Sequence, residues 1–200
     1  MRWYLLLLLL VLTGCGVSEP MEDASILPVQ AVPESEPAPM PEPEAADFVR
    51  VQEYLPDILV DLKYAGAENF TGQAVYDFTD AYLRYGTVQK LSSALDILMD
   101  QGYTLLIWDA FRPTQAQFRL WEICPDPVYV ANPETGFSSH SRGNTVDLTL
   151  AALDGEPVEM PTDFDDFSPL ADRDYSDVPA SAAANAQLLE DVLTACGFQP

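Results

Sequence analysis

Residues 138–150 read SSHSRGNTVDLTL, and this stretch decides how the rest of the chain is interpreted. It contains His140, the only histidine of the sequence, and Asp147, which follows seven residues later. TVDLTL, residues 145–150, has the pattern of a strand. A turn at Gly143 would let the loop histidine and the strand aspartate converge. Both side chains are good zinc ligands, but the pair alone is a weak signal, because a catalytic zinc takes three protein ligands and a water.

Four further stretches have the pattern of regular secondary structure. Strands are expected at 58–65, ILVDLKYA, and at 103–109, YTLLIWD. Helices are expected over 79–101 and over 181–196. Strands and helices alternate without the βαβ rhythm of a parallel sheet. We therefore expect an α+β fold with a mostly antiparallel sheet and flanking helices.

A shorter helix is expected to open at Arg112-Pro113-Thr114, directly after the strand 103–109. Its inner face should carry Phe118 and Trp121. Residues 151–179 have little periodicity and many acidic side chains, so they are expected to form a long loop.

The composition excludes some functions. With 200 residues, of which 48% are apolar, the chain can form one folded domain. Its 9 basic and 32 acidic residues give a formal net charge of −23, which would repel a nucleic acid. A small zwitterion, a cationic group or a metal ion is a more natural partner. The simpler alternative is that the acidity only keeps an exported protein soluble.

The N-terminus has the features of an export signal. Residues 3–12, WYLLLLLLVL, are too few to span a bilayer but suit the apolar part of a signal peptide. Residues 12–15, LTGC, resemble the lipobox of bacterial lipoproteins, whose cysteine is lipidated. This predicts a signal peptide and lipobox over 1–15, with Cys15 anchored to the cell membrane on its outer side. The alternative is an ordinary N-terminal anchor with a chance cysteine.

The export signal leads into a Pro- and Glu-rich segment, residues 16–46, which is expected to be a disordered tether. The folded domain is expected over 47–200. Within it, Cys124 and Cys196 could pair in an oxidising compartment, or remain two free thiols; the sequence favours neither.

Several motifs together resemble one enzyme family. SxHxxGxxxD, which ends at Asp147, is the metal-binding motif of the LAS-type zinc peptidases, and SSHSRGNTVDLTL is most similar to their D-alanyl-D-alanine dipeptidase branch. Other signatures of that branch have counterparts in the expected order, namely DLKYA and NFTG at 61–65 and 69–72, DAFRP at 109–113 and MPTDFD at 160–165. The resemblance extends over residues 48–198 and implies the LAS/hedgehog-type zinc peptidase fold.

The resemblance also implies a site that uses Zn²⁺. His140 and Asp147 would be zinc ligands, and Arg112 would donate hydrogen bonds to the carbonyl oxygen of the substrate as it becomes an oxyanion. Ser138 would hold the carboxylate of the substrate, and Asp165 its ammonium group. Each of these residues also has a simpler, non-catalytic interpretation: a surface salt bridge for Arg112, a turn residue for Ser138 and an ordinary member of an acidic loop for Asp165. The neighbours Asp163 and Asp166 make the alignment of Asp165 with the family ambiguous.

The sequence departs from the family pattern near residue 200. The family completes its site with an ExWH segment, which supplies the general base and the third zinc ligand. Here Gly197-Phe198 is followed by Gln199-Pro200, and Glu190 lies inside the expected last helix, where it should not act as the base. We expect either a fragment of a longer gene, which would also lack the last strand of the sheet, or a degenerate relative that binds without hydrolysing.

The expected function is hydrolysis of D-Ala-D-Ala or a related small cell-wall dipeptide by a lipid-anchored zinc metallopeptidase. The first alternative is a D,D- or L,D-carboxypeptidase that acts on peptidoglycan stem peptides, which suits an extracytoplasmic place better. The second is a non-catalytic lipoprotein that binds muropeptides or D-amino acids. The sequence gives no indication of the oligomeric state.

Overall fold

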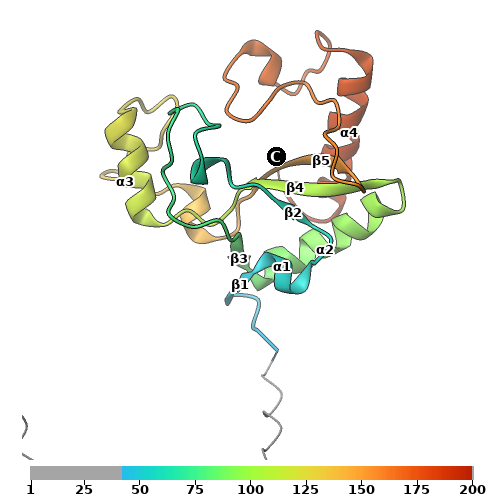
Figure 1. The fold of residues 1–200 in the computed structure, drawn as a ribbon, viewed down its shortest axis with the longest axis horizontal. Coiled ribbons are helices and arrows are strands. Elements are labelled where there is room, and N and C mark those ends of the chain that lie inside the picture. Colours follow the sequence, from blue (N-terminus) through green and yellow to red (C-terminus); the bar gives the residue numbers. More distant parts are fainter. Residues whose placement is uncertain (1–41, 200) are drawn as a thin grey trace, which may run out of the picture. The chain divides into compact units, whose positions relative to one another are not determined.

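The computed structural model describes residues 42–199, which form a mixed α+β domain (Figure 1). Cys15, the signal peptide and most of the predicted tether lie outside the described residues. None of the helices within 42–199 is both long and apolar enough to cross a membrane. The elements are β1 (Phe48–Arg50), α1 (Val51–Tyr54), β2 (Leu59–Val60), β3 (Tyr82–Arg84), α2 (Tyr85–Met99), β4 (Tyr103–Asp109), α3 (Thr114–Ile123), β5 (Asp147–Ala152) and α4 (Ala180–Ala195), with 3₁₀ turns at Lys63–Ala65, Ser139–Arg142 and Pro169–Ala171.

The strands form two small sheets. β4 is the central strand of the larger sheet, with β2 parallel on one side and β5 antiparallel on the other. β1 and β3 form a separate antiparallel pair. The expectation of an α+β fold is confirmed, and two of its three strand pairings are antiparallel while the β2–β4 pairing is parallel.

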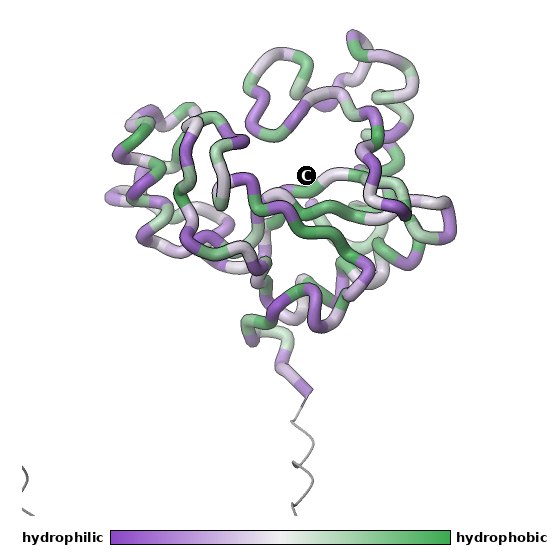
Figure 2. Tube along the Cα trace, in the orientation of Figure 1, coloured by the Kyte–Doolittle hydropathy of each residue, from purple (hydrophilic) through white to green (hydrophobic). Residues whose placement is uncertain are grey.

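The core lies between the larger sheet and α2. Leu105 and Ile107 of β4 are fully buried, and α2 presents to the core a stripe with helical spacing: Val88, Leu91, Ala94, Leu95 and Leu98. Each such leucine, fully buried, contributes about 1.5–3 kcal/mol. Figure 2 shows the apolar residues concentrated in the central strands. Leu106 and Trp108 alternate with the core residues and therefore face the opposite side, where the long loop 153–179 lies (Figure 1).

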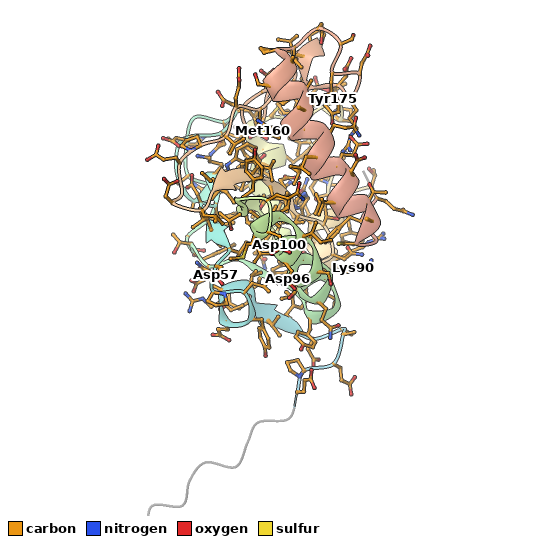
Figure 3. The ribbon with its side chains drawn as sticks, turned by 90° about the vertical axis from the view of Figure 1, so that its right-hand side faces the viewer. Asp57, Lys90, Asp96, Asp100, Met160 and Tyr175 are labelled. Atoms are coloured by element: carbon orange, nitrogen blue, oxygen red, sulfur yellow. The ribbon has the colours of Figure 1, made fainter. Side chains whose placement is uncertain are left out.

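Helix α4 closes the other side of the core. It contacts α2 and β5, its Leu189 and Val192 belong to the core, and Ala182 and Ala186 are also buried. Lys90 of α2, labelled in Figure 3, donates from Nζ to the carbonyl oxygen of Gly197 at 2.7 Å, just beyond the C-terminus of α4. A cation at the C-terminus of a helix is favourable because it faces the negative end of the helix dipole. Met160 and Tyr175, also labelled in Figure 3, belong to the loop between β5 and α4.

Two expected elements differ from the structure by more than two residues at one end, whereas the strand expected at 145–150 (Asp147–Ala152) and the helix expected over 181–196 (Ala180–Ala195) differ by at most two. The helix expected over 79–101 begins at Tyr85, because residues 82–84 pair with β1 as a strand. That pairing depends on a partner more than thirty residues away, which local periodicity cannot reveal. Of the strand expected over 58–65, only Leu59–Val60 is a strand in the structure, and a 3₁₀ turn follows at Lys63–Ala65. The turn still buries Leu62 and Tyr64, which satisfies the alternating pattern without a sheet.

The inner face of α3 was predicted wrongly in one respect. Phe118 is 42% exposed, whereas Trp121 is half-buried as expected. The buried positions are instead Ala116, Gln117 and Leu120. Gln117 is polar but buried, so the apolar residues alone did not indicate which side of the helix faces the core.

The two remaining cysteines are both free and half-buried. Of the two alternatives, the structure therefore shows Cys124 and Cys196 as thiols and not as a disulfide.

The small β1–β3 sheet holds the loop that follows His140. Gly143 has φ +74°, and a Cβ atom there would lie 2.2 Å from Cε1 of Phe48 in β1. The backbone N–H of Arg84 donates to the carbonyl oxygen of Gly143 at 2.8 Å, and Arg84 Nε donates to that of Arg142 at 2.8 Å. Gly143 is thus required both for its backbone conformation and for the close approach of Phe48.

Replacing Gly143 by Ala should destabilise the domain by roughly 2–4 kcal/mol, from the left-handed backbone and the clash with Phe48. Urea unfolding would measure this loss. Gly66→Ala is the matched control, because Gly66 has an extended backbone and a Cβ atom added there would have no neighbour within 4 Å. Equal stability of the two variants would contradict the close packing of Phe48 on Gly143.

Candidate active site

His140 is held with one ring nitrogen free. It lies in the 3₁₀ turn Ser139–Arg142 with only 8% of its surface exposed. Its backbone N–H donates to Oγ of Ser138 at 3.3 Å, which caps the turn. Nδ1 lies 2.9 Å from the carbonyl oxygen of Ala110. Since a carbonyl oxygen can only accept, Nδ1 carries the proton of the neutral ring, and the lone pair of Nε2 is available to a metal ion.

Asp147 supplies a carboxylate on the Nε2 side of this ring. It is the first residue of β5, and its Oδ2 lies 3.5 Å from His140 Nε2. Two ligands of a tetrahedral zinc at about 2.0–2.1 Å would lie ~3.3 Å apart, so the spacing fits a shared metal ion. Burial raises the pKa of Asp147, while the imidazole of His140 acts to lower it.

Asp109 is the third member of a group that could hold a metal ion. One ligand atom from each of Asp109, His140 and Asp147 lies within 4.8 Å of the others. Asp109, however, lies on the other side of the imidazole, with Oδ2 3.4 Å from Nδ1. The two ring nitrogens point in different directions, so a metal ion at Nε2 would be shared with Asp147. Asp109 is better placed to support the ring than to bind the same ion.

The carboxylate of Asp109 is already satisfied by protein donors. Its side chain is 0% exposed. Oδ1 accepts from Tyr76 Oη at 2.7 Å and from the backbone N–H of Ala110 at 2.9 Å, and Oδ2 accepts from Arg112 Nη2 at 2.6 Å. A buried carboxylate with this set of donors is an anchor for its neighbours, above all for Arg112.

Arg112 is buried at the centre of a hydrogen-bonded network. Besides the ion pair with Asp109, its Nε donates to Tyr76 Oη at 3.3 Å and its Nη1 to Oε1 of Gln117 at 3.1 Å. The guanidinium carbon lies 5.0 Å from the centre of the Tyr64 ring. Burial acts to lower the pKa of Arg112, but the charge of Asp109, its hydrogen bond and the neighbouring Tyr76 and Tyr64 together outweigh burial and hold that pKa above its usual value.

The same network leaves Arg112 able to bind a substrate oxygen. A guanidinium has five N–H bonds, and three of those of Arg112 have partners among residues 42–199. One N–H on each terminal nitrogen remains. Donors on a fixed cation are suited to an oxygen that gains negative charge during a reaction.

Asp165 is the acidic residue of the 163–166 cluster that turns inward. It is half-buried, whereas Asp163 and Asp166 are exposed. Oδ1 of Asp165 accepts from Tyr64 Oη at 3.2 Å, and Oδ2 accepts from the backbone N–H of Phe70 at 3.2 Å. Its φ of 57° is unusual for a residue other than glycine. Burial raises the pKa of Asp165, and the two hydrogen bonds oppose that rise.

Asp147 and Asp165 line one cleft of about 470 Å³ between β5, α4 and the loop 153–179. Tyr64 joins Asp165 to the rest of the site, because its hydroxyl holds Asp165 while its ring lies over Arg112. Ser138 is adjacent to His140, and its oxygen is already used as the cap. The structure thus brings Arg112, His140 and Asp147 together through Asp109, and connects Asp165 to them through Tyr64.

Sequence reasoning missed three residues of this site. Asp109, Tyr76 and Gln117 contact Arg112, yet none was assigned a role. Asp109 was within reach of sequence reasoning, because a carboxylate three residues before a buried arginine is a natural ion-pair partner. Glu190 of α4 lines the same cleft as Asp147, where it accepts from Tyr175 Oη at 2.8 Å and lies 3.4 Å from Nη1 of Arg173.

Comparisons with known proteins agree on one family. A profile of the peptidase M15 family, described as D-Ala-D-Ala dipeptidase, matches residues 44–200. A D-alanyl-D-alanine dipeptidase of Escherichia coli K12 is 37% identical over 155 residues, which cover 78% of this chain and 80% of that protein. Similar proteins with the same description occur in Streptomyces coelicolor, 36% identical with 76% and 85% covered, and in Enterococcus faecium, 31% identical with 76% and 85% covered.

Replacing Asp109 by Asn should destabilise the domain by about 3–5 kcal/mol, because it leaves the charge of Arg112 buried without its counter-ion. Adding Arg112→Met should restore much of this loss, since the double variant buries no unpaired charge. Chemical unfolding of both variants measures the effect, with Asp96→Asn on the exposed face of α2 as the control. A double variant no more stable than Asp109→Asn would show that the ion pair is not what stabilises this region.

Proposed function

Because this chain belongs to the peptidase M15 family of D-Ala-D-Ala dipeptidases, we propose that it is a zinc-dependent hydrolase of D-Ala-D-Ala or a related small cell-wall dipeptide. One observation carries the proposal: the free Nε2 of His140 and the carboxylate of Asp147 lie 3.5 Å apart, on the ring edge opposite the Ala110 carbonyl. For the chain as a whole, we propose the LAS/hedgehog-type zinc peptidase fold.

His140 and Asp147 would hold the zinc ion. When bound, zinc polarises the scissile carbonyl and lowers the pKa of a coordinated water. Arg112 would donate its two remaining N–H bonds to the carbonyl oxygen as negative charge develops there. Asp109 neutralises the guanidinium in the resting protein and fixes its place, so little reorganisation is needed during the reaction.

The two ends of the dipeptide would be recognised by Asp165 and Ser138. Asp165 offers a half-buried carboxylate to the free ammonium group, and a charged pair in a cleft is stronger than one on an open surface. The oxygen of Ser138 accepts from His140, so its hydroxyl hydrogen remains free to donate to the substrate carboxylate. A site that must bind both a free ammonium group and a free carboxylate would prefer a dipeptide to a longer peptide as its substrate.

Asp165→Asn should lower kcat/KM for free D-Ala-D-Ala by roughly 10- to 100-fold, because a neutral amide binds the ammonium group much less strongly. N-acetyl-D-Ala-D-Ala, which lacks that charge, should be a poor substrate of the unaltered protein. Release of free D-alanine measures both. Asp163→Asn, at an exposed position two residues away, is the control.

Other outcomes of this assay point to the alternatives. Equal turnover of the blocked and free substrates would favour a carboxypeptidase that acts on stem peptides. Binding of the dipeptide, measured by calorimetry, without release of D-alanine would favour a non-catalytic binding lipoprotein. The observation that keeps this alternative open is that His140 is the only histidine of the sequence. Zinc content after dialysis, compared with that of His140→Ala, shows separately whether the site holds metal.

We propose that the protein is attached to the outer side of the cell membrane through lipid on Cys15. The support is the apolar run 3–12 followed by LTGC. Metabolic labelling with a radioactive fatty acid in a lipoprotein-making bacterium should mark the unaltered protein but not Cys15→Ser. Equal labelling of both would place the anchor elsewhere.

A further inference from the structure

We propose that Gln117 and Tyr76 are positioning residues that fix the orientation of the Arg112 guanidinium, so that its two remaining N–H bonds keep one direction. The orientation follows from the contacts in the structure, whereas the catalytic use of Arg112 rests on the proposed function. Neither residue is expected to touch the substrate.

Each of the three guanidinium nitrogens has its own acceptor, and each acceptor comes from a different part of the fold. Nε donates to Tyr76, in the loop before β3, Nη1 to Gln117 of α3, and Nη2 to Asp109 at the end of β4. A planar group held by a single ion pair can still rotate about that contact. Three acceptors around its edge, with Tyr64 over one face, leave it a single orientation.

The burial of Gln117 is unusual for an amide side chain and depends on partners for both of its ends. It lies on the inner side of α3, between Ala116 and Leu120, with only 2% of its surface exposed. Burying an amide there instead of an apolar side chain is unfavourable unless its polar atoms are paired. Both ends are paired, because Oε1 accepts from Arg112 at 3.1 Å and Nε2 donates to the carbonyl oxygen of Ala131 at 2.7 Å.

The bond to Ala131 also fixes which way the amide points. A carbonyl oxygen can accept only from the NH₂ group, so the oxygen of Gln117 is directed toward Arg112. The amide therefore joins the guanidinium to the loop that leads to Ser138 and His140. Leucine at this position would fill the space but would hold neither partner.

Tyr76 acts on the opposite edge of the guanidinium. Its hydroxyl donates to Asp109 at 2.7 Å and accepts from Arg112 Nε at 3.3 Å, so it bridges the two members of the ion pair. The ring is stacked on Phe78, with centres 4.7 Å apart and planes at 13°. Burial raises the pKa of Tyr76 above its usual value, so the hydroxyl keeps its proton and this pattern is retained at neutral pH.

Orientation matters because donors stabilise an oxyanion only over a narrow range of distance and angle, and a misplacement of about 1 Å can cost 10²-fold in rate. Asp109 alone supplies the counter-charge. Gln117 and Tyr76 supply the directions that a charge by itself does not.

Arginine side-chain ¹⁵N NMR tests the inference directly on the full chain. The measurement does not require the protein to be enzymatically active. Slow rotation in the parent protein should give separate Nη signals for Arg112, assigned by their absence in Arg112→Lys. Gln117→Leu should merge them by freeing rotation. Gln115→Leu, the same change at an exposed position of α3, should leave them separate. Separate signals that persist in Gln117→Leu would overturn the role of Gln117.

Two conservative variants keep the test decisive if Gln117→Leu does not fold. Gln117→Glu retains an acceptor for Nη1 and should preserve the separate Nη signals. Tyr76→Phe removes only the hydroxyl and should speed exchange of the Arg112 Nε–H proton with water. Merged signals in Gln117→Glu, or unchanged exchange in Tyr76→Phe, would contradict the inference.

Kinetics adds an independent measurement. Gln117→Leu should lower kcat and kcat/KM together, by about 10- to 100-fold, with KM and zinc content little changed, because only the transition state uses the orientation of Arg112. A raised KM at unchanged kcat would instead indicate a role in substrate binding. If the parent protein does not hydrolyse the dipeptide, the proposed function fails, and the NMR comparison still decides the positioning role.

Discussion

The buried ion pair between Asp109 and Arg112 is the constraint on which the site depends. Arg112 Nη2 lies 2.6 Å from Asp109 Oδ2, and both side chains are almost fully buried. Neither charge could remain in the interior without the other. Both oxygens of Asp109 and three of the five N–H bonds of Arg112 have partners within the pair or among its neighbours, which are the hydroxyl of Tyr76, the amide of Gln117 and the backbone of Ala110. The ion pair therefore organises a set of polar groups from separate segments, which an apolar core would not have held in register.

The same short segment also orients His140, the proposed zinc ligand. Residues 109–112, the end of β4 and the irregular segment after it, supply the carboxylate of Asp109, the carbonyl oxygen of Ala110 that faces His140, and the side chain of Arg112. The proton of the imidazole is thus fixed by the backbone of the same short segment that carries the guanidinium and its counter-ion. The electrophilic groups proposed for catalysis lie on rigid backbone at the end of a central strand, which favours preorganisation.

Much of this site could be predicted from the sequence, because its signals are local. The spacing of His140 and Asp147, the strand at 103–109 and the place of Arg112 after it all follow from neighbouring residues. The parts that could not be predicted depend on contacts between distant segments. Tyr82–Arg84 pairs with a strand from the start of the domain, and Gln117 has a buried role only because Arg112 and Ala131 surround it. Asp165 stood out from Asp163 only once Tyr64 and Phe70 were seen to donate to it.

The packing of Phe48 on Gly143 also has a mechanical consequence. The chain enters the domain at β1, and it is fixed there by three residue pairs with β3 and by the bond from Tyr85 N–H to the carbonyl oxygen of Asp47. A pull on the chain ahead of Phe48 would therefore load β1 before any other strand. Since Phe48 covers the loop that carries His140, separation of β1 would uncover that loop while the larger sheet remained intact. In a protein held by its N-terminus, the loop that carries His140 would respond to force earlier than the hydrophobic core.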